Sequence, residues 1–337
     1  MVLVLVVMSY EIKTGDALET LLTLSDESIS CCVTSPPYWG LRDYGVGGQL
    51  GLESTPEEYT DKLVAIFREV RRVLKPEGTL WLNLGDTYAA ARGGSGMPAE
   101  TLAGGQNGHG DEDSHRGRGS RESYNPKRDC TKYGLKHKDL VGIPWMAAFA
   151  LRKDGWYLRQ DIIWQKFNSM PESVKDRCTK SHEYIFLMSK SEKYYYDYKA
   201  IMEPAVYGQQ HADKTTSWGT NRKHPNKANI ADYAFTGDNK TCYKDERGYM
   251  KNKRSVWNVS TKPYKGAHFA VFPPELITPC IFAGSKVGDT VLDPFSGSGT
   301  TGVVCLANDR NYLGIELNPE YVKLSHERIS QSKLGLR

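Results

Sequence analysis

Two consecutive prolines follow a short β-prone run near the start of the chain, in the segment TSPPYWG at 34–40. Proline fixes φ and lacks a backbone N–H, and the first of the pair also favours an extended conformation at Ser35. The segment therefore predicts a stiff loop that offers the Ser35 hydroxyl, the Pro36 carbonyl and the Tyr38 ring. These groups suit a flat ligand that donates hydrogen bonds, such as the exocyclic amine of a nucleobase. An ordinary strand exit stiffened by Pro36 and Pro37 is the alternative.

A second segment, at 290–302, reads as a strand, a glycine loop and a helix. Its glycines fit the dinucleotide-binding pattern G-x-G-x-x-G: Gly297, Gly299 and Gly302. Asp293 ends the strand, and Glu316 ends the next one, where dinucleotide folds keep a ribose-binding acid. A pyrophosphate would meet like charge at Asp293, whereas the ammonium and sulfonium groups of S-adenosylmethionine (AdoMet) would be attracted. The segment favours AdoMet, and a nicotinamide-dependent oxidoreductase is the alternative.

Together the two segments resemble the amino-methyltransferases of DNA, in the order that places the catalytic motif first and the AdoMet motif last. TSPPY at 34–38 matches the family's catalytic motif, and DPFSGSGTT at 293–301 matches its cofactor motif. The resemblance extends to Asp16, in the segment whose acid contacts the AdoMet adenine, and to 268–285, the helix that closes over the methionine end. It implies an AdoMet-dependent enzyme that acts on double-stranded DNA, in a restriction–modification system that can include an endonuclease.

The resemblance implies a set of site residues. Those of catalysis are Ser35, Pro36, Pro37 and Tyr38. Those that bind AdoMet are Asp16, Phe272, Ser285, Asp293, Pro294, Phe295, Gly297, Gly299, Thr300, Thr301, Glu316 and Asn318. Ser35 and the Pro36 carbonyl would accept both N–H bonds of the target amine, which aims the nitrogen lone pair at the methyl group without a metal. Tyr38 would stack on the base, which must leave the duplex to reach the site.

The residue before Pro-Pro-Tyr indicates which amine is methylated. In the resembling family serine usually accompanies cytosine N4, and aspartate or asparagine usually accompanies adenine N6. Ser35 therefore favours cytosine N4, with adenine N6 as the alternative. A nucleic-acid-binding protein without catalysis is the alternative from another class.

Basic and aromatic residues are interleaved at 205–265, a composition that suits a phosphate backbone with stacking or groove contacts. A solvated charged face is the alternative. The predicted DNA contacts are Lys251, Lys253 and Arg254, together with Arg42 just past the catalytic loop.

Alternating strand and helix patterns are typical of an α/β protein. Helices are predicted at 56–74 and 140–151, and strands at 78–84, 156–165, 183–189 and 311–315. The resemblance implies the AdoMet-dependent methyltransferase fold, a mostly parallel seven-stranded sheet with an antiparallel edge strand, into which an irregular DNA-recognition region is inserted. The expected division is a catalytic half at 9–91, a flexible glycine-rich loop at 92–138, remaining strands and helix at 139–204, target recognition at 205–265 and an AdoMet-binding half at 266–337.

The overall composition sets few limits. The 337 residues carry a net charge of +4, which neither requires nor excludes nucleic acid as a partner. Seven cysteines without a C-x-x-C pair or secretory signal indicate a reducing cytoplasm, with no disulfide or metal site. The apolar run 1–8 is too short to span a bilayer and reads as an extension or an extra strand. Cys280 follows a proline, like the nucleophile of cytosine-C5 methyltransferases, but its apolar helical surroundings predict core packing. A monomer and a homodimer both remain open.

Overall fold

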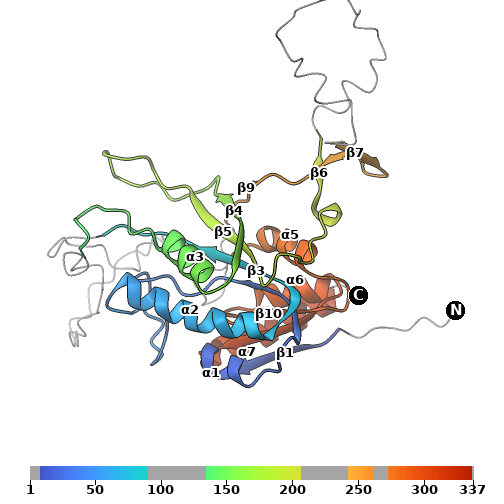
Figure 1. Ribbon diagram of the computed structural model, residues 1–337, viewed down its shortest axis with the longest axis horizontal. Helices are drawn as coiled ribbons and strands as arrows, with labels where there is room; N and C mark the ends of the chain where they lie inside the picture. The colour runs from blue at the N-terminus through green and yellow to red at the C-terminus, as the bar shows by residue number, and fades with distance from the viewer. Residues whose placement is uncertain (1–7, 90–133, 206–241, 262–271, 336–337) are drawn as a thin grey trace, which may run out of the picture.

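The computed structural model describes residues 8–89, 134–205, 242–261 and 272–335, and its main feature is an eight-stranded sheet (Figure 1). In spatial order the strands are β1 (Tyr10–Thr14), β11 (Asn311–Glu316), β10 (Thr290–Asp293), β2 (Ile29–Thr34), β3 (Leu74–Leu84), β5 (His182–Ser189), β4 (Tyr157–Gln165) and β9 (Val256–Asn258). All neighbours pair in parallel except β5, which is antiparallel to both β3 and β4. The prediction of a mostly parallel α/β sheet is confirmed.

Two details of the predicted sheet are wrong. The sheet has eight strands and not seven, because the three-residue strand β9 pairs in parallel with β4. The antiparallel strand is not at the edge, because β5 pairs with β3 on one side and with β4 on the other. β4 and β5 pair antiparallel, and β4 lies between β5 and β9.

A second, smaller sheet holds β6 (Glu203–Pro204), β8 (Gly248–Lys251) and β7 (Cys242–Asp245) in that order. Its strands pair antiparallel, and β7 and β8 form a hairpin. The region 205–265, expected to be irregular, therefore contains regular strands in its described part. The remainder of that region, the apolar run 1–7 and most of the glycine-rich stretch 92–138 lie outside the described residues.

Helices cover both faces of the main sheet. One face packs against α1 (Ala17–Leu22), α2 (Pro56–Val73) and α3 (Ile143–Lys153), and the other against α5 (Pro274–Gly284), α6 (Thr300–Ala307) and α7 (Pro319–Gly335), with a short 3-10 helix at Lys199–Ile201. Figure 1 shows α2 and α3 as neighbours and α5 grouped with α6. Successive residues of β2 alternate between the two cores, since Cys32 packs on the first face and Cys31 and Val33 on the second. A strand buried on both faces reads as a continuous apolar run.

Local signals in the sequence account for α2. Thr55 caps its first turn by accepting the Glu58 N–H at 3.0 Å, and Pro56 occupies the first helical turn. Its buried side chains recur at helical spacing: Tyr59, Leu63, Ile66, Phe67 and Val70. The predicted helix at 56–74 is confirmed, and β3 follows directly from Leu74, earlier than expected.

Close packing of α5 against the sheet depends on a glycine at its last turn. A Cβ built on Gly284 would lie 2.6 Å from Cys31 Sγ, 2.8 Å from Thr79 Oγ1 and 2.9 Å from Trp81 Nε1. In the same helix Cys280 is 1% exposed, which confirms its predicted core position, and burial raises its thiol pKa well above the usual value. Within the described residues no helix is both long and apolar enough to cross a bilayer.

We expect Gly284→Ala to lower the free energy of unfolding by about 2 kcal/mol, because the added methyl group overpacks a buried contact between α5 and the sheet. Gly47→Ala is the control, since a Cβ on that exposed glycine meets nothing within 4 Å. Urea unfolding of both variants measures the difference. Equal stability of the two variants would contradict the close approach of α5.

Candidate active site

Three carboxylates and the proline loop come together at one edge of the main sheet. β1, β11, β10 and β2 are parallel neighbours, so their carboxyl ends lie side by side. Asp16 follows β1, Glu316 ends β11, Asp293 ends β10 and Ser35 follows β2. The Gly15 N–H donates to the Glu316 carbonyl at 3.0 Å and so joins two of these ends. Ligands of open parallel sheets bind outside the carboxyl ends of the strands.

Asp293 is a buried carboxylate that accepts hydrogen bonds on both oxygens. Its Oδ1 accepts from Thr34 Oγ1 at 2.6 Å and from the Phe295 N–H at 3.1 Å, and its Oδ2 accepts from Thr301 Oγ1 at 2.7 Å. Burial raises the pKa of Asp293 to about 6, although the three hydrogen bonds act in the opposite direction. Asp293 therefore joins the end of β2 to the first turn of α6. Its predicted role towards a cofactor ammonium group stays a prediction.

Glu316 is held against the glycine loop. Its Oε2 accepts the Gly297 N–H at 2.8 Å, and its Oε1 accepts the Asn318 N–H at 2.9 Å. Burial raises the pKa of Glu316, and the backbone N–H groups of Asn318 and Gly297 lower it. The Asn318 side chain in turn accepts the Glu320 N–H at 2.9 Å, at the start of α7. The predicted ribose-binding acid thus has a fixed orientation beside the glycines.

The glycine loop is braced from α7, which the sequence did not predict. Gly299 has φ of +74°, a conformation that favours glycine, and a Cβ there would lie 3.0 Å from Ser325. Ser325 Oγ donates to the Gly297 carbonyl at 2.6 Å, and Arg328 Nη1 donates to the hydroxyls of Ser298 and Thr300 at 2.7 Å each. These contacts brace the glycine loop against α7.

Other predicted cofactor residues have structural roles in this chain. Asp16 caps α1, where its Oδ1 accepts the Glu19 N–H at 3.0 Å. Pro294 is buried, and Phe295 packs against the core on the α2 side. Phe272 is half-buried before α5, on the other face. Any contact of these residues with AdoMet stays a prediction.

Ser285 is not brought to the site. It is buried, donates to the Ile281 carbonyl at 2.6 Å and accepts from Arg310 Nε at 3.4 Å. Arg310 precedes β11, whereas Glu316 ends it, so the two lie at opposite ends of a strand that is roughly 17 Å long. The prediction that Ser285 lies at the cofactor site is corrected. Ser285 directly follows α5, which ends at the edge of the sheet where β10 begins, and not at the edge that carries Glu316.

The proline loop is packed from several sides. The Pro37 carbonyl accepts from Tyr59 Oη at 2.8 Å, and Trp39 Nε1 donates to the Glu53 carbonyl at 2.9 Å. Gly51 lies so close that a Cβ there would be 2.9 Å from the Tyr38 carbonyl oxygen. These tertiary contacts hold the loop in addition to its two prolines, and its predicted stiffness stays a prediction.

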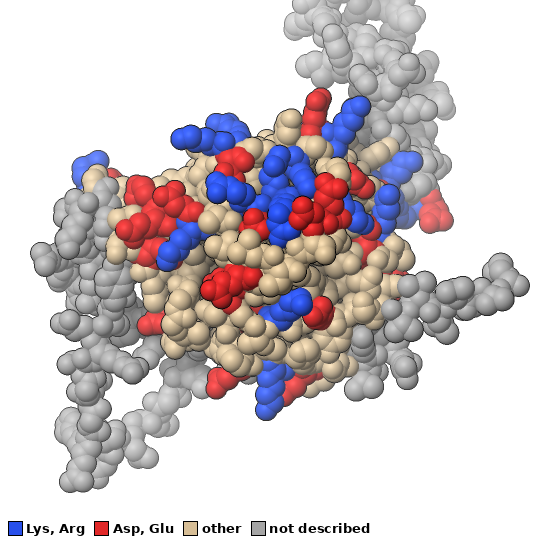
Figure 2. Space-filling model, turned by 60° about the horizontal axis from the view of Figure 1, so that its bottom comes forward, with Lys and Arg blue, Asp and Glu red and all other residues tan. Residues whose placement is uncertain are grey.

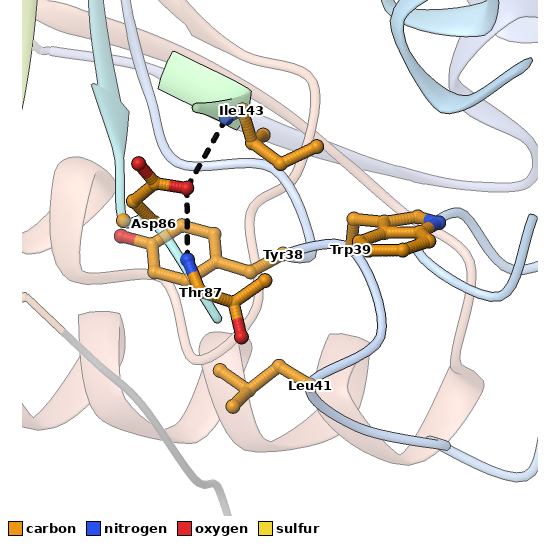
Figure 3. Close-up of a pocket in the computed structure, with 7 residues that line it drawn as sticks. Tyr38, Trp39, Leu41, Asp86, Thr87 and Ile143 are labelled. Carbon is orange, nitrogen blue, oxygen red and sulfur yellow. Dashed lines mark hydrogen bonds between the residues drawn. The ribbon is translucent and has the colours of Figure 1, made fainter. Parts of the chain in front are cut away.

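Beside the loop lies a small cavity of about 40 Å³, which Figure 3 shows. Its lining residues are Tyr38, Trp39, Leu41, Gly85, Asp86, Thr87 and Ile143. Asp86 Oδ1 accepts the N–H groups of Thr87 and Ile143 at 2.9 and 3.1 Å (Figure 3). It also accepts the Gly142 N–H at 3.0 Å and so caps α3. The volume holds a few water molecules but not a base.

The predicted DNA contacts have protein partners. Glu203 Oε1 lies 3.4 Å from Lys251 Nζ and 3.2 Å from Arg254 Nε, and Lys253 Nζ lies 5.1 Å from the centre of the Trp257 ring. Arg42 is half-buried near Tyr44, whose pKa its charge lowers against the larger effect of burial. Figure 2 shows basic and acidic side chains interspersed on one face. DNA contact by these residues stays a prediction, which the salt dependence of binding would check.

Comparison with known proteins decides the family. A family profile described as DNA methylase, N6_N4_Mtase, matches residues 29–327. The chain belongs to the N6/N4 DNA methylase family. It is a DNA methyltransferase, which confirms the resemblance seen in its motifs. The nicotinamide-dependent and non-catalytic alternatives are therefore wrong.

Similar proteins agree with this family. The type II methyltransferase M.SmaI of Serratia marcescens is 48% identical over 321 residues, which cover 95% of this chain and 91% of that protein. The type II methyltransferase M.Cfr9I of Citrobacter freundii is 47% identical over 320 residues, with 94% and 86% covered.

Solved structures share the fold. The PvuII DNA methyltransferase, which is cytosine-N4-specific, has a TM-score of 0.58 at 19% identity, with 96% of this chain and 91% of that chain covered. A putative DNA modification methylase of Thermus thermophilus, complexed with S-adenosyl-L-methionine, has a TM-score of 0.54 at 23% identity, with 96% and 94% covered. The methyltransferase fold of this DNA methyltransferase is thereby confirmed.

The raised pKa of Asp293 predicts a pH-dependent stability. Its folded pKa of about 6 exceeds the ordinary value of 3.8, so the native state gains stability as the carboxyl takes up a proton below pH 6, and loses it as pH rises through 6. Relative to Asp293→Asn, which cannot ionise there, the wild type should gain about 2 kcal/mol between pH 8 and pH 4.5. Denaturant unfolding of the two apo proteins at both pH values measures this. A constant difference between them would contradict the buried charge.

Proposed function

We propose that this DNA methyltransferase transfers a methyl group from AdoMet to N4 of cytosine in double-stranded DNA. The observation that carries the proposal is the position of Ser35 at the carboxyl end of β2, beside strands that end in Asp293 and Glu316. A neutral hydroxyl before Pro-Pro-Tyr favours cytosine N4, and adenine N6 is the alternative product. Because the M.SmaI and M.Cfr9I proteins are named type II methyltransferases, we also propose a companion endonuclease. Cleavage by that nuclease should be blocked by this methylation.

The strand ends fit AdoMet through their charge. AdoMet, when bound, supplies a methyl group on a cationic sulfur. Gly297 and Asn318 orient Glu316, which would accept from the ribose hydroxyls. Asp16, at the neighbouring strand end, would accept from the adenine amine. Asp293 is only 1% exposed. Its negative charge at the end of β10 attracts the cationic cofactor electrostatically, which does not require an exposed carboxylate. A pyrophosphate would be repelled there.

Methyl transfer then depends mainly on how the loop positions the amine. Ser35 Oγ and the Pro36 carbonyl accept its two N–H bonds, which aims the nitrogen lone pair along the line of displacement. The lone pair forms the new N–C bond while the C–S bond breaks and its electron pair stays on sulfur. The nitrogen then releases one proton to water. Tyr38 lines the cavity and stacks on the flipped base.

The product distinguishes the two target amines. We expect nucleoside mass spectrometry of DNA treated with the enzyme and AdoMet to show N4-methylcytosine. N6-methyladenine as the main product would overturn the choice of base. Ser35→Ala should lower the turnover number by about 100-fold, because an acceptor of the target amine is lost, with AdoMet affinity unchanged.

Ser28→Ala is the matched control for Ser35→Ala. Ser28 precedes the other end of the same strand, where its hydroxyl donates only to the Ser25 carbonyl at 2.8 Å. Its turnover should equal that of the wild type. Equal turnover of the two variants would remove Ser35 from the mechanism.

Cofactor binding provides a separate test. Glu316→Ala should weaken AdoMet binding by about tenfold or more, because the ribose loses a charged acceptor. Glu320→Ala, an exposed change in the first turn of α7, is the control and should bind AdoMet as the wild type does. Isothermal titration calorimetry measures both. Unchanged affinity of a folded Glu316→Ala protein would contradict the proposed cofactor orientation.

A further inference from the structure

The hydroxyl of Tyr38 lies between Ser35 and a carboxylate from a distant strand. Ser35 Oγ is 3.4 Å from Tyr38 Oη, and Tyr38 Oη is 2.7 Å from Glu183 Oε2. Glu183 lies near the start of β5, whereas Ser35 and Tyr38 follow β2. The other oxygen of Glu183 pairs with Lys166, which follows β4. Four side chains therefore form one chain of contacts that ends at the catalytic serine.

Each hydrogen bond in this chain has a direction. An ionised carboxylate only accepts, and the other oxygen of the Glu183 carboxylate is paired with the Lys166 ammonium group. The Tyr38 O–H must therefore donate to Glu183. Asn83 Oδ1 also lies near Tyr38 Oη, but at 3.2 Å, and a charged acceptor at 2.7 Å forms the stronger bond. Asn83 Nδ2 donates to the Tyr184 carbonyl at 3.0 Å and to Glu183 Oε2 at 3.3 Å, which fixes this amide.

The direction at Tyr38 decides the direction at Ser35. Burial and the nearby charge of Glu183 raise the pKa of Tyr38 well above its usual value, so the phenol keeps its proton at neutral pH. Once that proton is directed to Glu183, the phenol oxygen can only accept from Ser35. The serine proton then points away from the base, and the lone pairs of Ser35 Oγ are free to accept from the target amine.

We propose that Glu183 is a positioning residue that, through Tyr38, holds the Ser35 hydroxyl in the orientation in which it accepts from the target amine. The proposal rests on the proposed role of Ser35 in methyl transfer. A serine hydroxyl is both a donor and an acceptor. If the Ser35 O–H pointed at the target amine, it would repel the N–H bonds of that amine. Because the Glu183 carboxylate only accepts, it determines the direction in which the Tyr38 and Ser35 hydroxyls donate.

Glu183→Gln tests the proposal with little change in shape. A glutamine amide both donates and accepts, so it no longer fixes the direction at Tyr38. We expect the single-turnover rate of methylation to fall about tenfold, while the dissociation constants of AdoMet and of duplex DNA stay within about twofold of wild type. Tyr38→Phe removes the middle of the chain and should cause a similar loss. The double variant should lose little more than either single variant, because both changes interrupt one path.

Glu69→Gln is the matched control. The Glu69 side chain is 17% exposed and paired with Arg72 on α2, and that of Glu183 is 16% exposed and paired with Lys166. Glu69 lies near the end of α2, away from the carboxyl ends of the strands, so its variant should keep the wild-type rate. An unchanged rate for Glu183→Gln overturns the proposal, as does a rate loss with weakened AdoMet binding and a lower melting temperature, which indicates a structural role.

Two further outcomes separate this proposal from the proposed function. Independent, multiplicative losses in the double variant would show that Glu183 does not act through Tyr38, and would overturn the proposal while leaving the enzyme's activity intact. A wild-type enzyme that methylates neither cytosine nor adenine would instead overturn the proposed function.

Discussion

The buried carboxylate of Asp293 is the constraint on which the site depends. A charge removed from water is costly unless hydrogen bonds replace its hydration. Here the donors come from Thr34 at the end of β2 and from Thr301 in α6, and Thr34 is 259 residues away along the chain. Both hydroxyls reach the carboxylate only when β2 and the glycine loop take one relative position. Satisfying this one group therefore aligns the two halves of the site.

Burial of both sheet faces maintains that alignment. Cys32 belongs to one core, and its neighbours Cys31 and Val33 belong to the other, so a slip of β2 by one residue would exchange the faces of every side chain. The same slip would move Thr34 away from Asp293, and it would move Ser35 out of its position at the carboxyl edge of the sheet. Gly284 allows α5 to approach this part of the sheet closely. The position of the Ser35 hydroxyl is thus determined by apolar packing several residues away.

The sequence predicted what depends on local pattern and missed what depends on distant pairing. The α2 helix and the placement of both motifs at the carboxyl ends of β2, β10 and β11 follow from periodicity and short motifs. The place of β5 inside the sheet does not, because it is set by pairing with β3. Ser285 was assigned from resemblance without the direction of α5, which ends at the opposite edge. Glu183 carries no signal in the sequence, since its partner Tyr38 is 145 residues away and only the fold joins them.

The distribution of charge across the site matches the movement of charge in the proposed reaction. Before transfer the positive charge is on the sulfur of the cofactor, which the strand ends that carry Asp293 and Glu316 would hold. After transfer it is on the nitrogen held by Ser35, until a proton leaves. Glu183 lies two hydrogen bonds beyond that nitrogen's acceptor, so its negative charge polarises Tyr38 and Ser35 in the direction that stabilises a cation at the amine. A neutral serine can therefore serve where a charged acceptor would otherwise be needed, because the carboxylate acts through the phenol.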